Sequence, residues 1–345
     1  MTLFGGKNVL ITGGTGSFGK VFVRHLLERS DAPRRIVVYS RDEQKHVDMA
    51  RHHFPPSEYP QLRYFVGDVR DLPRLERAFR DVDVVVHAAA MKHVDLAEYN
   101  PQECIHTNIT GAENVIHASL DAGVERVVAL STDKAASPIN LYGATKLCAD
   151  KLFVAANALG GESGTRFAVV RYGNVLGSKG SVVPFFLKQR EKGVLPVTDA
   201  RMTRFWITLE QGVELVCRAF ETMVGGEIFV PKIPSMRVVE VAKAIAPECE
   251  LEFVGIRPGE KLHECLVPAD EARQTIEYDD HFVIEPSFSW WNRSASLDRP
   301  CGRRCPDGFV YSSDTNPQWL STEEIQVLLR PFVEEALGLS LTAAT

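Results

Sequence analysis

The sequence has no strongly basic cluster, no long apolar run and no internal repeat. Its 345 residues carry a formal net charge of −6, which argues against a nucleic-acid partner because binding to phosphates depends on grouped lysine and arginine. No apolar stretch reaches the length of about 18 residues that suggests a membrane span. The first residues lack the pattern of a secretory signal peptide. We therefore expect a cytoplasmic protein with no membrane partner.

Cysteine motifs are also scarce. The seven cysteines are an odd number and mostly scattered, which is typical of reduced cytosolic thiols. Cys301 and Cys305 are close together in Cys-Gly-Arg-Arg-Cys, but no second pair accompanies them and the histidines lie at a distance. We predict no metal site.

Apolar runs and helical patterns alternate along the first half of the chain. We predict strands at residues 8–12, 35–39, 62–66, 82–90, 126–130 and 167–171. This alternation predicts an α/β fold with a doubly wound parallel sheet of the Rossmann type. Later segments are shorter and punctuated by glycine and proline, which predicts a smaller C-terminal substrate-binding lobe. We place the Rossmann domain at residues 1–173 and the lobe at 174–345, with segments at about 205–231, including a strand at 226–230, returning to the Rossmann side.

A glycine loop directly follows the first strand. Gly13, Gly16 and Gly19 lie between that strand and a helical pattern. This spacing lets the backbone turn tightly and approach a pyrophosphate at a helix N-terminus, although a glycine loop alone can be a structural turn. We expect cofactor contacts from Thr12, Gly13, Thr15, Gly16, Ser17, Phe18 and Gly19.

The end of the second strand bears on the choice between NADP and NAD. Ser40, Arg41 and Lys45 suit a ribose 2′-phosphate, so we favour NADP, with NAD as the alternative. Asp42 and Glu43 lie nearby, which leaves open that Arg41 and Lys45 are ordinary solvated charges at a helix start.

Two further strand ends complete the predicted cofactor site. Asp68 is placed to accept a hydrogen bond from the adenine amine, or alternatively to cap the helix that begins at residue 72. Small residues after the fourth strand would let the backbone approach the cofactor. The remaining expected contacts are Val69, Ala88, Ala89, Lys92, Tyr142 and Lys146.

The most informative motif follows the strand at residues 126–130. Thr132, Asp133 and Lys134 should emerge at its carboxyl end, where open α/β sheets bind ligands. Tyr142 and Lys146 lie one helical turn apart on one face. A phenol has a reference pKa of about 10, and a nearby ammonium favours the phenolate, so we expect Lys146 to lower the pKa of Tyr142.

Plainer interpretations of these residues stay open. Asp133 and Lys134 could form an ion pair at a strand end, and Thr132 could be a turn hydroxyl. Tyr142 and Lys146 could be a pair on a helix surface.

The motifs together resemble the extended short-chain dehydrogenase/reductase superfamily. Within it, the chain resembles the inverting UDP-N-acetylglucosamine 4,6-dehydratases that open pseudaminic acid synthesis. The resemblance covers nearly the whole chain and is weakest at residues 287–304. The motifs that carry it are Thr-Gly-Gly-Thr-Gly-Ser-Phe-Gly, Tyr-Ser-Arg-Asp-Glu, Gly-Asp-Val-Arg-Asp, Ser-Thr-Asp-Lys-Ala, Asn-Leu-Tyr-Gly-Ala-Thr-Lys, Met-Thr-Arg-Phe-Trp and Arg-Pro-Gly-Glu-Lys.

The resemblance implies a redox cycle on UDP-N-acetylglucosamine. Tyr142 would take the proton of the 4-hydroxyl while hydride leaves carbon 4 for the nicotinamide, with Thr132 bonded to the same hydroxyl and Lys146 on the ribose. Lys134 would then remove the proton on carbon 5, for which it must be neutral, and we expect burial and the charge of Lys146 to lower its pKa. Asp133 would protonate the departing 6-hydroxyl. Return of hydride to carbon 6 and of a proton to the opposite face of carbon 5 gives UDP-2-acetamido-2,6-dideoxy-β-L-arabino-hexos-4-ulose.

Other residues match family motifs for the nucleotide sugar. Arg204 and Arg257 suit the diphosphate and Glu260 the uridine ribose. Arg204 could instead form an ion pair and pack on a neighbouring aromatic ring, and Lys92 could face only solvent. The expected substrate contacts are Lys92, Asn174, Thr198, Arg204, Arg257 and Glu260.

Three alternative functions remain. Retaining relatives typically carry Met in place of Tyr142, UDP-sugar 4-epimerases lack the Asp133–Lys134 pair, and sensors that bind NADP without turnover usually lose the tyrosine. Apolar helix faces at residues 108–120 and 145–157 could bury a four-helix contact, so we expect a homo-oligomer, either a dimer or a hexamer.

Overall fold

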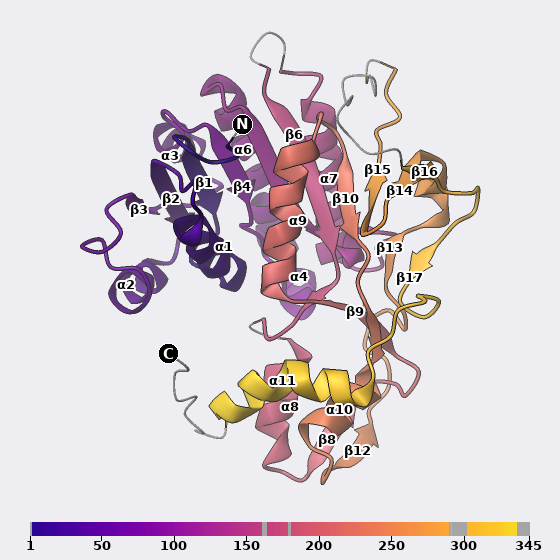
Figure 1. Ribbon diagram of the computed structural model, residues 1–345. Helices are drawn as coiled ribbons and strands as arrows, with labels where there is room; N and C mark the ends of the chain where they lie inside the picture. Colours follow the sequence, from indigo (N-terminus) through magenta and orange to yellow (C-terminus); the bar gives the residue numbers. More distant parts are fainter. Residues whose placement is uncertain (1, 161–163, 179–180, 290, 292–301, 337–345) are drawn as a thin grey trace.

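A ten-stranded sheet runs through the centre of the protein (Figure 1). The computed structural model describes residues 2–160, 164–178, 181–289, 291 and 302–336. The strands of this sheet are β1 (Asn8–Thr12), β2 (Arg35–Ser40), β3 (Leu62–Val66), β4 (Val84–His87), β5 (Arg126–Thr132), β6 (Arg166–Tyr172), β10 (Ile228–Pro231), β14 (Thr275–Glu277), β15 (His281–Ile284) and β16 (Arg303–Arg304). Their order is β16-β14-β15-β10-β6-β5-β4-β1-β2-β3, and all neighbours from β10 to β3 pair in parallel.

Helices cover both faces of the parallel strands. They are α1 (Ser17–Glu28), α2 (Glu43–His52), α3 (Leu72–Ala78), α4 (Val94–Tyr99), α5 (Pro101–Ile105), α6 (Gly111–Asp121), α7 (Leu141–Ala156) and α9 (Leu209–Thr222). α1 packs with α9 on one face, and α6 packs with α3 and α7 on the other (Figure 1). β1 and β4 are therefore buried along their whole length, as their apolar central residues require. The predicted doubly wound α/β fold is confirmed.

Several of these helices begin at residues that cap them. Asp71, Asn140 and Thr208 each accept a hydrogen bond from a backbone N–H in the first turn of α3, α7 and α9. Because Asp71 caps α3, the alternative prediction that Asp68 caps this helix is wrong.

The sheet continues past its last parallel strand. β15 pairs antiparallel with β10, and β14 pairs with both β15 and β16. The strand predicted at residues 226–230 is present as β10, which joins β6 as expected. Sequence analysis did not anticipate the three antiparallel strands, whose short segments showed no clear alternation. The domain boundary at residue 173 stays a prediction, since strands from both before and after this residue belong to the main sheet.

A second, smaller core lies in the lobe. Its helices are α8 (Val182–Arg190), α10 (Val238–Ile245) and α11 (Thr322–Ala336), which pack on one another. Its small sheets contain β7 (Asn174–Val175), β8 (Val194–Val197), β9 (Thr203–Ile207), β11 (Ser235–Arg237) and β12 (Glu250–Phe253). Phe186, Leu195 and Leu329 are buried at its centre. The shorter elements of the chain are β13 (Cys265–Val267), β17 (Tyr311–Ser312), the π-helical turn η1 (His106–Thr110) and the 3-10 turns η2 (Asp133–Ala135) and η4 (Ala269–Gln274).

The lobe faces the carboxyl ends of the parallel strands. The chain leaves β6 at Tyr172 and enters β7 at Asn174, so the lobe begins where β6 ends. Strand register keeps the neighbouring ends level, since Thr12 pairs with His87 and Thr132 pairs with Tyr172. This is the edge at which open α/β sheets bind ligands.

Gly19→Ala should destabilise the protein. A Cβ on Gly19 in α1 would lie 2.2 Å from the carbonyl oxygen of Gly14, a backbone atom that cannot move without disturbing the glycine loop. We expect a loss of about 1–3 kcal/mol in the free energy of unfolding, measured by urea denaturation.

Gly212→Ala in α9 is the matched control. A Cβ at Gly212 would meet the Phe18 ring at 3.9 Å, which is an ordinary contact. The better helix propensity of alanine should then stabilise the protein by about 0.5–1 kcal/mol. Similar stabilities for the two variants would contradict the close approach at Gly19.

Candidate active site

Two backbone loops meet at the carboxyl ends of β1 and β4. Gly13 has a φ of 66°, which favours glycine, and a Cβ there would lie 2.8 Å from the backbone nitrogen of Ala89. The Thr12 hydroxyl lies 2.8 Å from His87 Nδ1 and accepts a hydrogen bond from Ala89 N–H, while Ala88 N–H donates to the Thr12 carbonyl. The predicted residues Thr12, Gly13, Ala88 and Ala89 are thus brought together by their backbones.

The N-terminus of α1 completes the glycine loop. The helix begins at Ser17, and its N-cap residue Gly16 makes no side-chain cap, so the first-turn N–H groups suit an anion. Thr15 donates a hydrogen bond to the Ser40 hydroxyl at the end of β2, at 2.9 Å. The Phe18 ring stacks on Phe22. The glycine loop therefore contacts the end of the second strand.

The charges after β2 have different surroundings. Asp42 caps α2 by accepting from Lys45 N–H, and the Lys45 amine lies 2.9 Å from the same carboxylate. Arg41 is 61% exposed and lies 4.0 Å from Asp68. Lys45 is therefore engaged at the helix start, whereas the Arg41 guanidinium faces solvent beside Ser40.

Asp68 follows β3 and remains an acceptor. Partial burial alone would raise the pKa of Asp68. Hydrogen bonds from the Arg70 side chain and backbone outweigh burial, so the pKa of Asp68 is lowered. Val69, the next residue, is buried against Gly111. Contact of Asp68 and Val69 with an adenine stays a prediction.

The predicted catalytic residues gather where β5 ends and α7 begins. Thr132 closes the turn η2 by accepting from Lys134 N–H, and its hydroxyl donates to Asp133 at 3.0 Å. A Cβ on Gly143 would lie 2.1 Å from the Lys134 carbonyl oxygen, so glycine next to Tyr142 lets α7 approach this turn closely. The interpretation of Thr132 as a turn hydroxyl describes part of what it does.

Lys146 is a buried residue. Its side chain is at most 4% exposed, and the amine donates to the Leu130 carbonyl at 2.7 Å. Burial lowers the pKa of Lys146, and the nearby Asp150 carboxylate opposes that effect. A surface pair of Tyr142 and Lys146 is therefore a wrong interpretation.

Tyr142 is a weak acid in this state. Burial raises the pKa of Tyr142 to about 12, although the Lys134 charge and a hydrogen bond with Thr132 work in the other direction. The sequence analysis assigned the lowering charge to Lys146, and this detail is wrong, because Lys134 supplies it.

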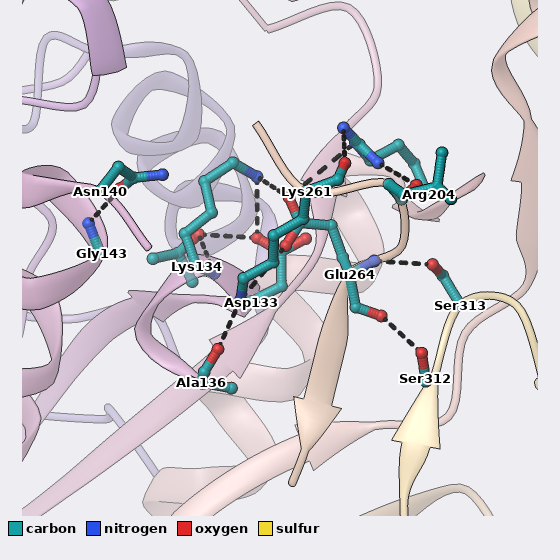
Figure 2. A network of polar contacts seen from close by, with 12 residues as sticks. Asp133, Lys134, Ala136, Asn140, Gly143, Arg204, Lys261, Glu264, Ser312 and Ser313 are labelled. Atoms are coloured by element: carbon teal, nitrogen blue, oxygen red, sulfur yellow. Dashed lines mark hydrogen bonds and ion pairs between the residues drawn. The ribbon is translucent and has the colours of Figure 1, made fainter. Parts of the chain in front are cut away.

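Lys134 lies between two carboxylates (Figure 2). Its amine is 3.0 Å from Asp133 Oδ1 and 3.1 Å from Glu264 Oε1. Burial alone would lower the pKa of Lys134, as expected, but the two carboxylates outweigh burial and the repulsion from Arg204, so the pKa is raised. The prediction of a lowered pKa is wrong for this state, and the repelling cation is Arg204 where we expected Lys146.

The predicted substrate residues occupy both sides of the site. Lys92 is exposed after β4. The Asn174 side-chain oxygen is buried and has no hydrogen-bond partner among the described residues. Arg257 and Glu260 lie close to each other, 3.9 Å apart, on the loop after β12, whose Gly255 N–H donates to the carbonyl of Thr198. Their contacts with a nucleotide sugar stay predictions.

The Arg204 side chain is hydrogen-bonded to backbone carbonyls. Its guanidinium donates to the carbonyls of Thr203, Lys261 and Leu262. These bonds hold the segment that carries Glu264. The ion pair of the alternative prediction is present, since Arg204 Nε lies 3.9 Å from Glu264 Oε1, whereas packing on an aromatic ring stays a prediction.

Three residues near the site were not predicted from the sequence. Glu264 and Lys261 lie beside the catalytic turn, and the Lys261 amine donates to the Ala136 carbonyl at 2.6 Å. The third is the buried Arg171, whose guanidinium pairs with Asp150 and Glu271 beneath Lys146. The Arg-Pro-Gly-Glu-Lys motif pointed to this region of the chain, but nothing in its spacing indicated contact with residue 134.

No metal cluster occurs in the described part of the chain. Cys301 lies outside the described residues, and burial raises the pKa of the Cys305 thiol to about 11, which disfavours the thiolate that binds metals. The described helices are too short or too polar to cross a membrane.

The glycine loop, the parallel sheet and the Tyr142–Lys146 pair define an extended short-chain dehydrogenase/reductase. Residues 9–286 match a family described as polysaccharide biosynthesis protein, and the chain belongs to this family.

Individual relatives are consistent with this assignment. The chain is 54% identical to UDP-N-acetylglucosamine 4,6-dehydratase (inverting) of Campylobacter jejuni, covering 94% of this chain and 97% of the relative. The X-ray structure of Pen from Bacillus thuringiensis superposes with a TM-score of 0.86 at 37% identity, covering 95% and 98%. DesIV, a dTDP-glucose 4,6-dehydratase from Streptomyces venezuelae solved with NAD and TYD, gives a TM-score of 0.65 at 26% identity, covering 74% and 86%.

The residues fit a nicotinamide dinucleotide. Gly13 leaves backbone room where a side chain would clash, and the first-turn N–H groups of α1 have no side-chain cap and suit a pyrophosphate. The neighbouring DesIV structure holds such a cofactor, which supports the same class of cofactor here.

Asp150→Asn should weaken the buried charges beneath the site. The Asp150 carboxylate accepts from Ser131 and lies 3.5 Å from the guanidinium of Arg171, which is fully buried. Its loss leaves Lys146 without a neighbouring carboxylate, and we expect about 3–5 kcal/mol of destabilisation in urea unfolding. Asp48→Asn, which removes a surface partner of Lys20, is the control and should change nothing measurable. Equal effects of the two substitutions would contradict this account.

Proposed function

We propose that the protein is a UDP-N-acetylglucosamine 4,6-dehydratase that inverts carbon 5. The observation that carries this proposal is the Asp133–Lys134 pair at the end of β5, with its amine 3.0 Å from the carboxylate and Tyr142 on the adjoining helix. An acid and a base on adjacent residues are what elimination of water requires. The relative from Campylobacter jejuni, 54% identical over nearly the whole chain, carries that activity in its name.

The first step makes carbon 5 acidic. A bound nicotinamide would supply reversible hydride transfer. Tyr142 takes the proton of the sugar 4-hydroxyl, and Thr132, on the turn that α7 adjoins, orients the same hydroxyl. Because burial keeps the pKa of Tyr142 high, the single positive charge of an oxidised nicotinamide ring would have to favour its phenolate.

The second step eliminates water. In the structure Lys134 is an ammonium hydrogen-bonded to Asp133 Oδ1. Transfer of that proton along the hydrogen bond yields a neutral amine and a carboxylic acid at once. The amine then removes the proton on carbon 5, and Asp133 gives its proton to the 6-hydroxyl, which departs as water. The pair ends as the ion pair from which it began. Return of the hydride from a bound nicotinamide to carbon 6 would restore the cofactor, and a proton delivered to the other face of carbon 5 completes the inversion.

The alternatives are less well supported by the residues. A 4-epimerase eliminates nothing and has no need of an acid beside Lys134. A sensor without turnover has no need of Tyr142, whose surroundings are built by Gly143 and Thr132. A retaining dehydratase would typically carry Met at this position.

We further propose NADP as the cofactor. Asp42 is occupied as the cap of α2, so it is not an isolated acceptor for a ribose 2′-hydroxyl. Arg41 is exposed beside Ser40 and the glycine loop, where it suits a 2′-phosphate. We also propose that the product enters pseudaminic acid synthesis and that the protein works in the cytoplasm as a homo-oligomer, either a dimer or a hexamer.

Incubation with UDP-N-acetylglucosamine in deuterium oxide tests the reaction. The purified protein should form a 4-keto-6-deoxy product with deuterium on carbon 5 and inverted configuration there, as measured by NMR and mass spectrometry. Retained configuration would move the assignment to the retaining relatives. A product with an intact 6-hydroxyl would indicate an epimerase, and no product at all would favour the sensor.

Arg41→Ala tests the cofactor. Loss of a charged hydrogen-bond donor to the 2′-phosphate should raise the Kd for NADP by about 10- to 100-fold and leave the Kd for NAD unchanged. Isothermal titration calorimetry measures both constants. Arg51→Ala, an exposed arginine at the far end of α2, is the control. Equal effects on NADP and NAD would overturn the preference.

A further inference from the structure

Glu264 is a buried carboxylate held rigidly at the start of β13. Its side chain is 2% exposed. Its backbone N–H donates to the Ser313 hydroxyl at 2.9 Å, and its carbonyl accepts from Ser312 at 3.2 Å (Figure 2). Thr203 in turn holds the Ser313 hydroxyl at 2.7 Å. The carboxylate is therefore presented to the site by a fixed backbone.

Three cations surround this carboxylate. Oε1 lies 3.1 Å from the Lys134 amine and 3.9 Å from Arg204 Nε, and Oε2 lies 3.8 Å from the Lys261 amine (Figure 2). With Asp133, the cluster contains two carboxylates and three cations. Glu264 thus offsets charge that would otherwise repel the Lys134 ammonium from the site.

Two of these cations are fixed by other contacts. Arg204 donates to the carbonyls of Lys261 and Leu262, and Lys261 donates to the carbonyl of Ala136. Lys134 differs, because its amine is held only by its two carboxylate contacts in the described structure. The Lys134 side chain is 22% exposed, so its amine can reach a ligand.

We propose that Glu264 is a positioning residue for the elimination: its carboxylate holds the Lys134 amine against Asp133 and sets the pH range in which that pair works. This inference rests on the proposed dehydratase function. The amine is placed by two carboxylates from distant parts of the chain, Asp133 after β5 and Glu264 before β13, so its position depends on the packing of β13 against η2.

The charges that face Lys134 decide the sign of the pH effect. They are Asp133 on its own turn, Tyr142 on α7, Glu264 before β13 and Arg204 on β9, with Lys261 behind Glu264. Removal of the negative charge of Glu264 makes loss of a proton from Lys134 easier. The pH range in which the pair shares one proton must then move to lower pH.

Glu264→Gln is the test, because Gln keeps the shape and one acceptor oxygen. In single turnovers of the full chain with NADP and UDP-N-acetylglucosamine, both limbs of the pH profile for elimination should move to lower pH by about 1–3 units. Glu264→Asp, which restores the carboxylate, should bring the limbs back toward those of the wild type. Lys134→Met should oxidise carbon 4 without losing water, which identifies the step.

Controls separate this role from a structural one. Glu252→Gln, on the exposed strand β12, should leave the profile unchanged. Unshifted limbs in Glu264→Gln, with or without a lower rate, would overturn the proposal, because a merely structural role lowers the rate at every pH alike.

A second measurement does not depend on the reaction. In protein labelled with ¹³C at lysine Cε, the signal missing from Lys134→Met reports the titration of residue 134, and its midpoint should fall in Glu264→Gln. An unchanged midpoint would overturn the proposal even if the wild type proves to be a dehydratase. If the wild type forms no 4-keto-6-deoxy product, the proposed function fails, and a shifted midpoint would still show that Glu264 controls the amine.

Discussion

Close contact between backbones is the constraint on which the site depends. Gly13 lies against the loop after β4, Gly19 against the carbonyl of Gly14, and Gly143 against the carbonyl of Lys134. At each point a Cβ would lie less than 3.0 Å from a backbone atom. These approaches bring the ends of three strands and the starts of two helices into one small region. The proposed cofactor, base and acid could share this region only because no side chains separate the backbones there.

Neighbouring charges are the second constraint, because they decide whether a buried lysine of the site keeps its proton. Lys134 is deep enough for burial to favour its neutral form, yet two carboxylates keep it charged. Lys146 has Asp150 nearby, and burial prevails there. Two lysines in one site thus have opposite tendencies, because carboxylates from different elements reach them. In the proposed elimination, a short proton transfer within the Asp133–Lys134 pair would supply both the acid and the base, without a proton from solvent.

Much of this architecture was predictable from local sequence. The strands at residues 8–12 and 62–66 and the glycine loop have strong signals, since continuous apolar runs and turn residues act over a few positions. The motif around Tyr142 also indicated which helix carries the phenol. What the sequence could not show was charge pairing at a distance. Asp133, the next residue, and Glu264, 130 positions away in the chain, both raise the pKa of Lys134, so the direction of its shift was predicted wrongly.

The antiparallel strands beside β10 have a mechanical consequence. After β6 the chain enters the lobe, returns for α9 and β10, leaves for α10, returns for β14 to β16 and leaves again for α11. Several segments of the chain therefore connect the sheet to the lobe, and cleavage at one position would leave the two parts covalently joined. Any movement of the lobe relative to the sheet must bend all of these connections at once, which favours a slight sliding of packed layers over a wide rotation about one hinge.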